Sequence, residues 1–218
     1  MNIMDSELLR WTNVGREPRW MAALVMTLVL FSGCAAAQKG PSVVRLKDGR
    51  QGFVIQEITK MDAVSRGEFN RAVILMNDGN NDTAIELLSR VIDRSPGFTA
   101  PHIDIAVAYM RSGKPGLAEQ HLKTALELVP DHPVASNEYG LLLRKSGRFK
   151  EAREIYEKAI DRFPDYLPAH RNLGILCDLY LNEPACALKQ FEIYSEGMPA
   201  DAQVKIWIAE LRMRPGVR

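Results

Sequence analysis

The stretch SGRFKEA (residues 146–152) has two earlier counterparts in the chain, SGKPGLA (residues 112–118) and DGNNDTA (residues 78–84). Each stretch has glycine at its second position and alanine at its last, and successive copies lie 34 residues apart. A fixed step of this length indicates that one supersecondary unit is copied along the chain. A single unit cannot bury its own apolar face, so we expect the copies to stack on one another.

Prolines mark the ends of the successive units, at steps of 34, 34 and 35 residues: Pro96, Pro130, Pro164 and Pro199. Between the prolines, each unit contains two segments of about a dozen residues whose apolar positions recur with helical periodicity. Glycine separates the two segments in the first three units, where a left-handed helix end is easiest for a residue without a side chain. The closing proline stops the second helix because it has no N–H. Each unit is therefore predicted to be a helix–turn–helix hairpin.

The residues at fixed positions in these units resemble the tetratricopeptide repeat (TPR), whose pattern is W-x2-L-G-x2-Y, then A-x3-F, then P. In the third unit the matching residues are Tyr139-Gly140, Leu143, Ala152, Tyr156, Ala159 and Pro164. The fourth unit fits with one extra residue in its turn, near Leu181-Asn182. In the first unit, Arg71 stands where an apolar residue is expected, which suits a terminal unit with one side in solvent.

Small residues recur at one position of each predicted helix. They are Ala72, Ala106, Gly140 and Gly174 on the first helices, and Ala84, Ala118, Ala152 and Ala187 on the second helices. Small side chains at both positions let the two backbones approach closely. The sequence therefore predicts an all-α fold, an α-solenoid of four TPR hairpins over residues 65–199 (65–98, 99–132, 133–166 and 167–200). A capping helix at residues 201–214, with Asp201 as its N-cap, is expected to close the stack.

Residues 1–33 have the pattern of a secretion signal. Arg16 and Arg19 precede an apolar core of 11 residues, Met21 to Phe31, which is followed by small residues. A membrane-spanning helix needs about 20 apolar residues, so a cleaved signal fits better than an ordinary anchor. An uncleaved anchor is the alternative. Because the apolar core begins late, Met4 is an alternative start of translation.

The sequence Phe31-Ser32-Gly33-Cys34 resembles the lipobox of bacterial lipoproteins, in which the cysteine is lipidated and becomes the new N-terminus. The resemblance implies a lipid on Cys34. Ala35 is not the aspartate associated with inner-membrane retention, which implies an outer-membrane lipoprotein that faces the periplasm. Residues 34–64 then form a tether, within which Asp48-Gly49 between VVRL and GFVI predicts a small hairpin.

The composition argues against nucleic-acid binding and against catalysis. The 28 basic residues are offset by 27 acidic ones, whereas phosphate binding needs clustered, uncompensated Lys and Arg. The chain contains no G-x-S-x-G elbow and no phosphate-cradling glycine loop. The histidines lack metal-ligand spacing: His102, His121, His132 and His170. We therefore predict no enzyme activity, metal, cofactor or small-molecule substrate.

Cys177 and Cys186 lie on the two predicted helices of the fourth unit. In an oxidising periplasm they are a candidate disulfide, although spacing alone does not give the pairing geometry. The alternative is that Cys177 is a small core residue at a position where the repeat carries an aromatic.

A ladder of apolar residues indicates where a partner protein binds. Val73, Val107, Leu141 and Ile175 recur every 34 residues on the first helices, which in this family line the concave face. The predicted groove adds Phe69, Met76, Ile103, Met110, Asn137, Arg144, Lys145, Arg171 and Asp178. This groove is apolar at its N-terminal end and basic-polar at its C-terminal end, which suits an amphipathic helix or an extended peptide.

The family resemblance implies a non-catalytic protein-binding scaffold in the bacterial cell envelope. Similar small repeat lipoproteins assist assembly of a pilus, of secretion machinery or of other envelope complexes. Some members of the family hold a partner's terminal carboxylate with polar residues. Phe69, Val73, Ile103 and Val107 occupy those places here, so that activity is not carried over. The alternative is a structural or self-associating subunit, for example of an energy-transducing complex, in which the ladder is packed as core.

Overall fold

A computed structural model describes residues 42–46, 52–56 and 60–216 of the chain. The predicted signal, Cys34 and the Asp48-Gly49 turn lie outside the described residues. Strands β1 (Ser42–Arg45) and β2 (Phe53–Gln56) pair antiparallel on either side of that turn.

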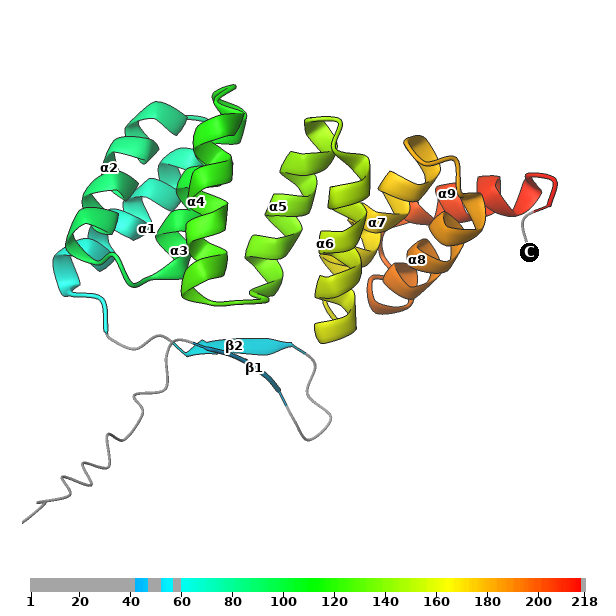
Figure 1. Cartoon of the computed structure of the whole chain (residues 1–218), viewed down its shortest axis with the longest axis horizontal. Helices are drawn as coiled ribbons and strands as arrows, with labels where there is room; N and C mark the ends of the chain where they lie inside the picture. Colours follow the sequence, from blue (N-terminus) through cyan, green and yellow to red (C-terminus); the bar gives the residue numbers. More distant parts are fainter. Residues whose placement is uncertain (1–41, 47–51, 57–59, 217–218) are drawn as a thin grey trace, which may run out of the picture. The chain divides into compact units, whose positions relative to one another are not determined.

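The repeats form helices in pairs (Figure 1). In chain order, the helices are α1 (Ala63–Asn77), α2 (Asn81–Arg94), α3 (Thr99–Arg111), α4 (Pro115–Leu128), α5 (Pro133–Lys145), α6 (Phe149–Arg162), α7 (Leu167–Leu179), α8 (Pro184–Gly197) and α9 (Ala202–Met213). Each odd-numbered helix from α1 to α7 packs against the helix that follows it, and each pair packs against the next pair. The first helices α1, α3, α5 and α7 also contact one another in succession. The predicted α-solenoid of four helix–turn–helix hairpins is confirmed.

The first three turns have the same backbone geometry. Gly79, Gly113 and Gly147 have φ values of 80°, 71° and 75°, a left-handed conformation that glycine adopts without strain. In each turn the residue after the glycine donates its N–H to the carbonyl five positions earlier, as Arg148 does to Leu143 at 2.9 Å. The fourth turn contains the extra residue, and there Asn182 takes the positive φ of 54°. The repeated glycine is thus a helix-ending residue, as its position in the sequence predicts.

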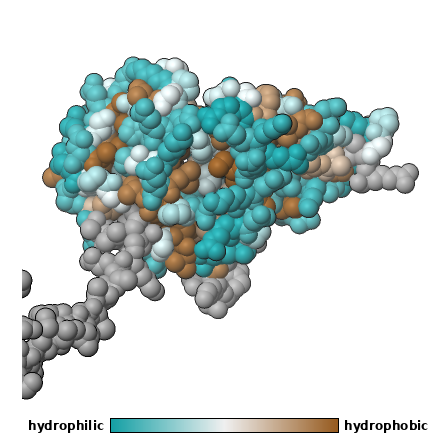
Figure 2. Space-filling model, viewed as in Figure 1, coloured by the Kyte–Doolittle hydropathy of each residue, from teal (hydrophilic) through white to brown (hydrophobic). Residues whose placement is uncertain are grey.

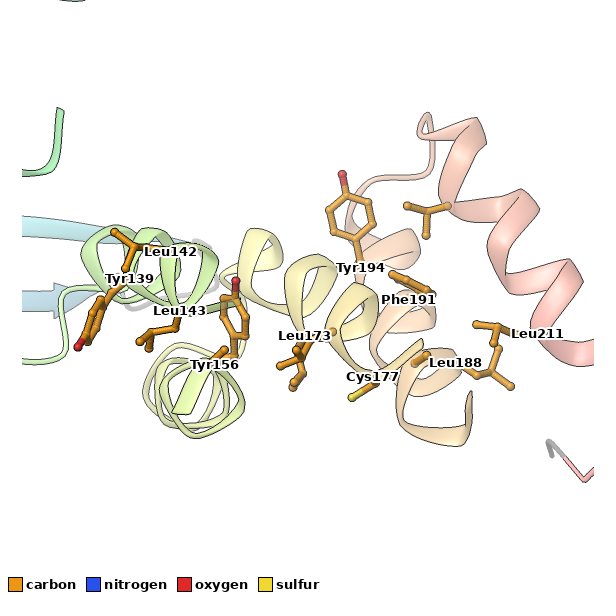
Figure 3. Close-up of a cluster of buried hydrophobic side chains, with 14 of the residues drawn as sticks. Tyr139, Leu142, Leu143, Tyr156, Leu173, Cys177, Leu188, Phe191, Tyr194 and Leu211 are labelled. Atoms are coloured by element: carbon orange, nitrogen blue, oxygen red, sulfur yellow. The ribbon is translucent and has the colours of Figure 1, made fainter. Parts of the chain in front are cut away.

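Gly140 on α5 and Gly174 on α7 lie directly under large rings of the second helices. An added β-carbon would lie 2.5 Å from the ring of Tyr156 at Gly140, and 2.5 Å from the ring of Phe191 at Gly174. Tyr156 and Phe191 are themselves buried. Figure 3 shows their rings among other apolar side chains in a cluster that continues from α5 to α9. This cluster joins the third and fourth hairpins to the capping helix.

The capping helix α9 closes the C-terminal end of this cluster. Asp201 accepts hydrogen bonds from the backbone N–H groups of Gln203 (3.1 Å) and Val204 (3.2 Å), as an N-cap does. Val204 and Leu211 are fully buried. The helix therefore covers an apolar face of α8 that a fifth repeat would otherwise cover.

The second helices carry the charged outer surface, which is mostly hydrophilic in the face shown in Figure 2. Glu119 on α4 binds Lys123 one turn later (2.9 Å) and Arg148 at the start of α6 (2.9 Å). Tyr139 also donates its hydroxyl to Glu119 (3.1 Å). Adjacent repeats are therefore linked by polar contacts as well as by the core, although pairs exposed to solvent contribute little individually.

We predict that Gly140→Ala lowers the free energy of unfolding by about 1–3 kcal/mol, because the new methyl group overlaps the buried ring of Tyr156. Urea unfolding followed by circular dichroism measures the change. The matched control is Gly67→Ala on α1, where an added β-carbon meets no atom within 4 Å. That control is expected to be neutral or slightly stabilising. Equal stability of the two variants would contradict the role given to Tyr156.

Candidate partner-binding groove

The apolar ladder lies along the first helices, and all four of its residues are partly buried: Val73, Val107, Leu141 and Ile175. Val107 packs against the core cluster formed by the first two hairpins, and Ile175 packs against the larger cluster that runs from the second hairpin to α9. These two residues thus support the core and still present part of their surface. Phe69 and Met110 are also partly buried and pack against these clusters.

Three of the predicted groove residues are buried inside the protein. The exposed fraction is 7% for Met76, 5% for Ile103 and 4% for Asn137. The side-chain oxygen of Asn137 accepts a hydrogen bond from Asn172 (2.9 Å), which links α5 to α7. These three residues support the groove from beneath, so the groove available to a partner is narrower than the sequence pattern indicates.

The charged residues at the C-terminal end of the predicted groove are engaged within the chain. The guanidinium of Arg144 lies 5.6 Å from the ring centre of Tyr180, and that of Arg171 lies 5.3 Å from the ring centre of Trp207. Asp178 forms an ion pair with Arg214 after α9 (2.5 Å). Lys145 is exposed. An aromatic ring does not cancel the charge of a guanidinium, so Arg144 and the exposed Lys145 leave this end of the candidate groove basic.

Two acidic residues that sequence reasoning did not select lie between these ends. Asp104 on α3 and Glu138 on α5 occupy equivalent repeat positions and are both partly buried. The pKa of Asp104 is raised to about 6, mainly by burial. The negative charge of the nearby Glu138 also raises this pKa, and its effect is larger than the opposite effect of Arg111. Burial also raises the pKa of Glu138, although Asn137 donates a hydrogen bond to its carboxylate (3.1 Å). Asp104 and Glu138 are separated by the 34-residue step, and each directly follows a predicted groove residue. This repeated acidic position could therefore have been recognised in the sequence.

The β1–β2 hairpin borders this part of the groove. The ring of Phe53 packs edge-on against three rings from the loops before α5 and α7: His132, Phe163 and Tyr166. The backbone N–H of Gly52 donates to Asp165 (3.1 Å), and Arg45 forms an ion pair with the same carboxylate (3.3 Å). The hairpin is thus attached to the end of the second repeat and to the end of the third, although α1 follows it in sequence.

The histidines and cysteines form structural contacts. Nδ1 of His102 lies 3.1 Å from Nδ1 of His121, and burial followed by the proximity of His121 lowers the pKa of His102 to about 4. His170 contacts Gln190 (2.7 Å) and the carbonyl of Pro164 (2.9 Å). With these partners, the histidines act as packing residues that join the two helices of their hairpins.

A disulfide joins Cys177 on α7 to Cys186 on α8, with 5.9 Å between their Cα atoms. Their sulfur atoms and the carboxylate of Glu183 lie within 4.8 Å of one another. That carboxylate also binds Arg153 (2.8 Å). The disulfide spans the fourth turn, where the extra residue lengthens the connection between the two helices.

Within residues 42–46, 52–56 and 60–216, no helix is long and apolar enough to cross a membrane.

Comparison with known proteins identifies the repeated unit. Residues 103–166 match a tetratricopeptide-repeat family model, and residues 68–97 match a second model of the same description. Residues 68–97 and 103–166 are therefore similar to tetratricopeptide repeats, as the spacing of the small and aromatic residues predicts.

Individual relatives share this architecture. The chain is 28% identical over 116 residues to the type IV pilus assembly protein PilF of Pseudomonas aeruginosa, covering 52% of this chain and 46% of PilF. It is 24% identical over 143 residues to the anaphase-promoting complex subunit CDC16 of Saccharomyces cerevisiae, covering 63% of this chain and 17% of CDC16. The chain thus spans less than half the length of either curated relative.

A solved structure of Pseudomonas aeruginosa PilF superposes with a TM-score of 0.64 at 23% identity, over 69% of this chain and 68% of that one. A likeness at this level of identity shows a shared fold. It leaves the groove of each protein free to bind a different partner.

We predict that the stability of the protein falls as pH rises through the titration of Asp104. Its folded-state pKa of about 6 lies above the ordinary value of 3.8, so the folded state binds the proton more tightly between these two pH values. The resulting destabilisation is complete above pH ~6 and absent below pH ~4.

Asp104→Asn removes this charge. It is therefore expected to raise the free energy of unfolding at pH 8 by about 1–2 kcal/mol, and to change it little at pH 4. Urea unfolding at both pH values measures the difference, with the exposed Asp161→Asn on α6 as the control. An effect of Asp104→Asn that is the same at both pH values would rule out this titration.

Proposed function

We propose that the chain is a non-catalytic scaffold of the bacterial cell envelope that holds a helix or extended segment of a partner protein against the first helices of its repeats. The observation that carries this proposal is the partly exposed apolar ladder, which recurs in all four repeats on one side of the solenoid. An apolar strip of this kind can receive the apolar face of an amphipathic helix. Matches to tetratricopeptide repeats support the same role, since protein binding is the general function of such domains.

The envelope location is proposed from the N-terminal sequence. The apolar core after Arg19 and the lipobox-like residues before Cys34 support export followed by lipidation, with the repeats on the periplasmic side of the outer membrane. The similarity to a type IV pilus assembly protein favours a part in assembly of a pilus or of a related envelope complex. Residues 35–41 then connect the lipid to β1.

The second candidate is a structural or self-associating subunit, in which another copy or a permanent partner covers the ladder. The half-buried state of Val107 and Ile175 favours this reading, because both already contribute to the core clusters. In that case, charges placed on the ladder unfold the protein or dissociate an oligomer.

We predict that Val107→Glu combined with Leu141→Glu abolishes capture of the partner, because a carboxylate in an apolar contact loses its hydration without gaining a counterion. The measurement is a pull-down of full-length protein after light crosslinking in cells, with circular dichroism melting of each variant. The matched control is Leu117→Glu combined with Ile206→Glu, which places the same charges on exposed apolar positions of α4 and α9. A folded double variant that retains the partner would place binding on another surface. Unfolding or loss of an oligomer would support the second candidate.

A separate prediction concerns the membrane. Cys34→Ala is expected to move the protein from the membrane fraction to a soluble or unprocessed form, because the acylated sulfur is lost. Mass spectrometry of the intact mature protein gives the second readout, the added mass of the lipid on Cys34. Unchanged fractionation together with an unmodified Cys34 would refute the lipoprotein proposal.

A further inference from the structure

An apolar pocket lies where the hairpin meets the first helices. Its volume is about 390 Å³, and its lining comes from β2, from the start of α3 and from the start of α5. The apolar lining residues include Phe53, Ile55, Phe98, Ile103 and Val134. Such a volume greatly exceeds the ~30 Å³ that one water occupies. The pocket is thus large enough for a side chain of a partner.

Acidic groups stand at one side of this pocket. Asp104 is itself part of the lining, and Glu138 lies one helical turn after the lining residue Val134 on α5. Among the residues that the structure describes, no cationic side chain forms an ion pair with either carboxylate. Arg111 is near enough to lower both pKa values, and Lys145 is near enough to lower that of Glu138. The guanidinium of Arg111 donates to the carbonyl of Met76 (2.9 Å). The two carboxylates, both partly withdrawn from water, therefore have cations near them but no direct ion pair among the described residues.

The charges at the other end of the groove are different. Arg144 and Arg171 lie over aromatic rings, and Arg171 is also 3.9 Å from Asp201. Asp178 has Arg214 as its partner, and Lys145 is exposed. The acidic pair therefore lies beside the apolar pocket, whereas the other end of the groove carries the basic residues.

We infer that the pocket between β2, α3 and α5 receives a large apolar side chain of a partner segment, while a Lys or Arg next to that side chain binds Asp104 and Glu138. This inference rests on the proposed function and specifies the chemistry of the partner. A long basic side chain fits because its aliphatic part can lie along apolar surface while its charged end reaches the carboxylates. An acidic segment is repelled at the same place, so the acid pair also provides selectivity.

The experiment begins with random short peptides displayed on phage and selected on the full-length protein in detergent micelles. We expect enrichment of sequences in which Lys or Arg adjoins Phe, Leu, Ile or Met. Fluorescence anisotropy with the most enriched peptide then measures affinity for the wild type and for each variant. Affinity is expected to fall as salt is added, because the contact is electrostatic.

Asp104→Asn combined with Glu138→Gln should weaken this peptide on the order of tenfold or more, because both carboxylates lose their charge while the side-chain shape is kept. The matched control is Glu154→Gln combined with Asp161→Asn, exposed positions on α6 that should leave the affinity unchanged. Ala100→Phe, which adds a ring at the pocket lining, should weaken the peptide without altering any charge. Circular dichroism verifies that each variant is folded.

The outcomes separate this inference from the proposed function. Peptides that lack basic residues, or whose binding survives Asp104→Asn with Glu138→Gln, overturn the inference. If Val107→Glu with Leu141→Glu still abolishes binding of such peptides, the groove function stands. An absence of any enriched peptide, or binding that no groove variant affects, overturns both. Loss of binding in the acid-neutralised variant and in Ala100→Phe, with the α6 control intact, supports the inference.

Discussion

The solenoid depends on how closely two helices approach within each hairpin. At the crossing of α5 and α6, Gly140 leaves a space that the ring of Tyr156 fills, and Phe191 fills the equivalent space at Gly174. An aromatic ring that packs directly against a glycine fixes both the distance between the two helices and their register. The hairpins recur at a nearly constant step in the sequence, and each first helix contacts the next one. The shared surface of the first helices follows from that repetition.

The sequence was sufficient for this architecture because its determinants are local. A glycine with a left-handed backbone ends a helix whatever surrounds it, and the three turn glycines adopt that conformation. The added residue in the fourth turn was also visible in the spacing, and Asn182 takes over the backbone role of the glycine there. Local determinants at a fixed step are what a single sequence displays best.

The site was harder to predict because its chemistry arises from contacts between elements. Arg171 looked free on its own helix, yet its partners Trp207 and Asp201 belong to the capping helix and its N-cap. The sequence periodicity of α7 alone does not indicate either of these two partners. Conversely, Asp104 and Glu138 were visible as a repeated acidic position, but their burial depends on how α3 and α5 pack. The sequence indicated which helices carry the candidate groove residues, but it did not indicate which of these residues are buried or which charges have partners.

The attachment of the hairpin has a consequence for the order of folding. Helical repeats are held together by contacts between neighbours in sequence, so they can form one after another from the N-terminal end of the chain. The bond from Gly52 to Asp165 joins residues 113 positions apart. Strands β1 and β2 are therefore made early but cannot dock until the loop before α7 exists. Docking of the hairpin thus marks the completion of the third repeat, and until then the ring of Phe53 lacks its aromatic neighbours.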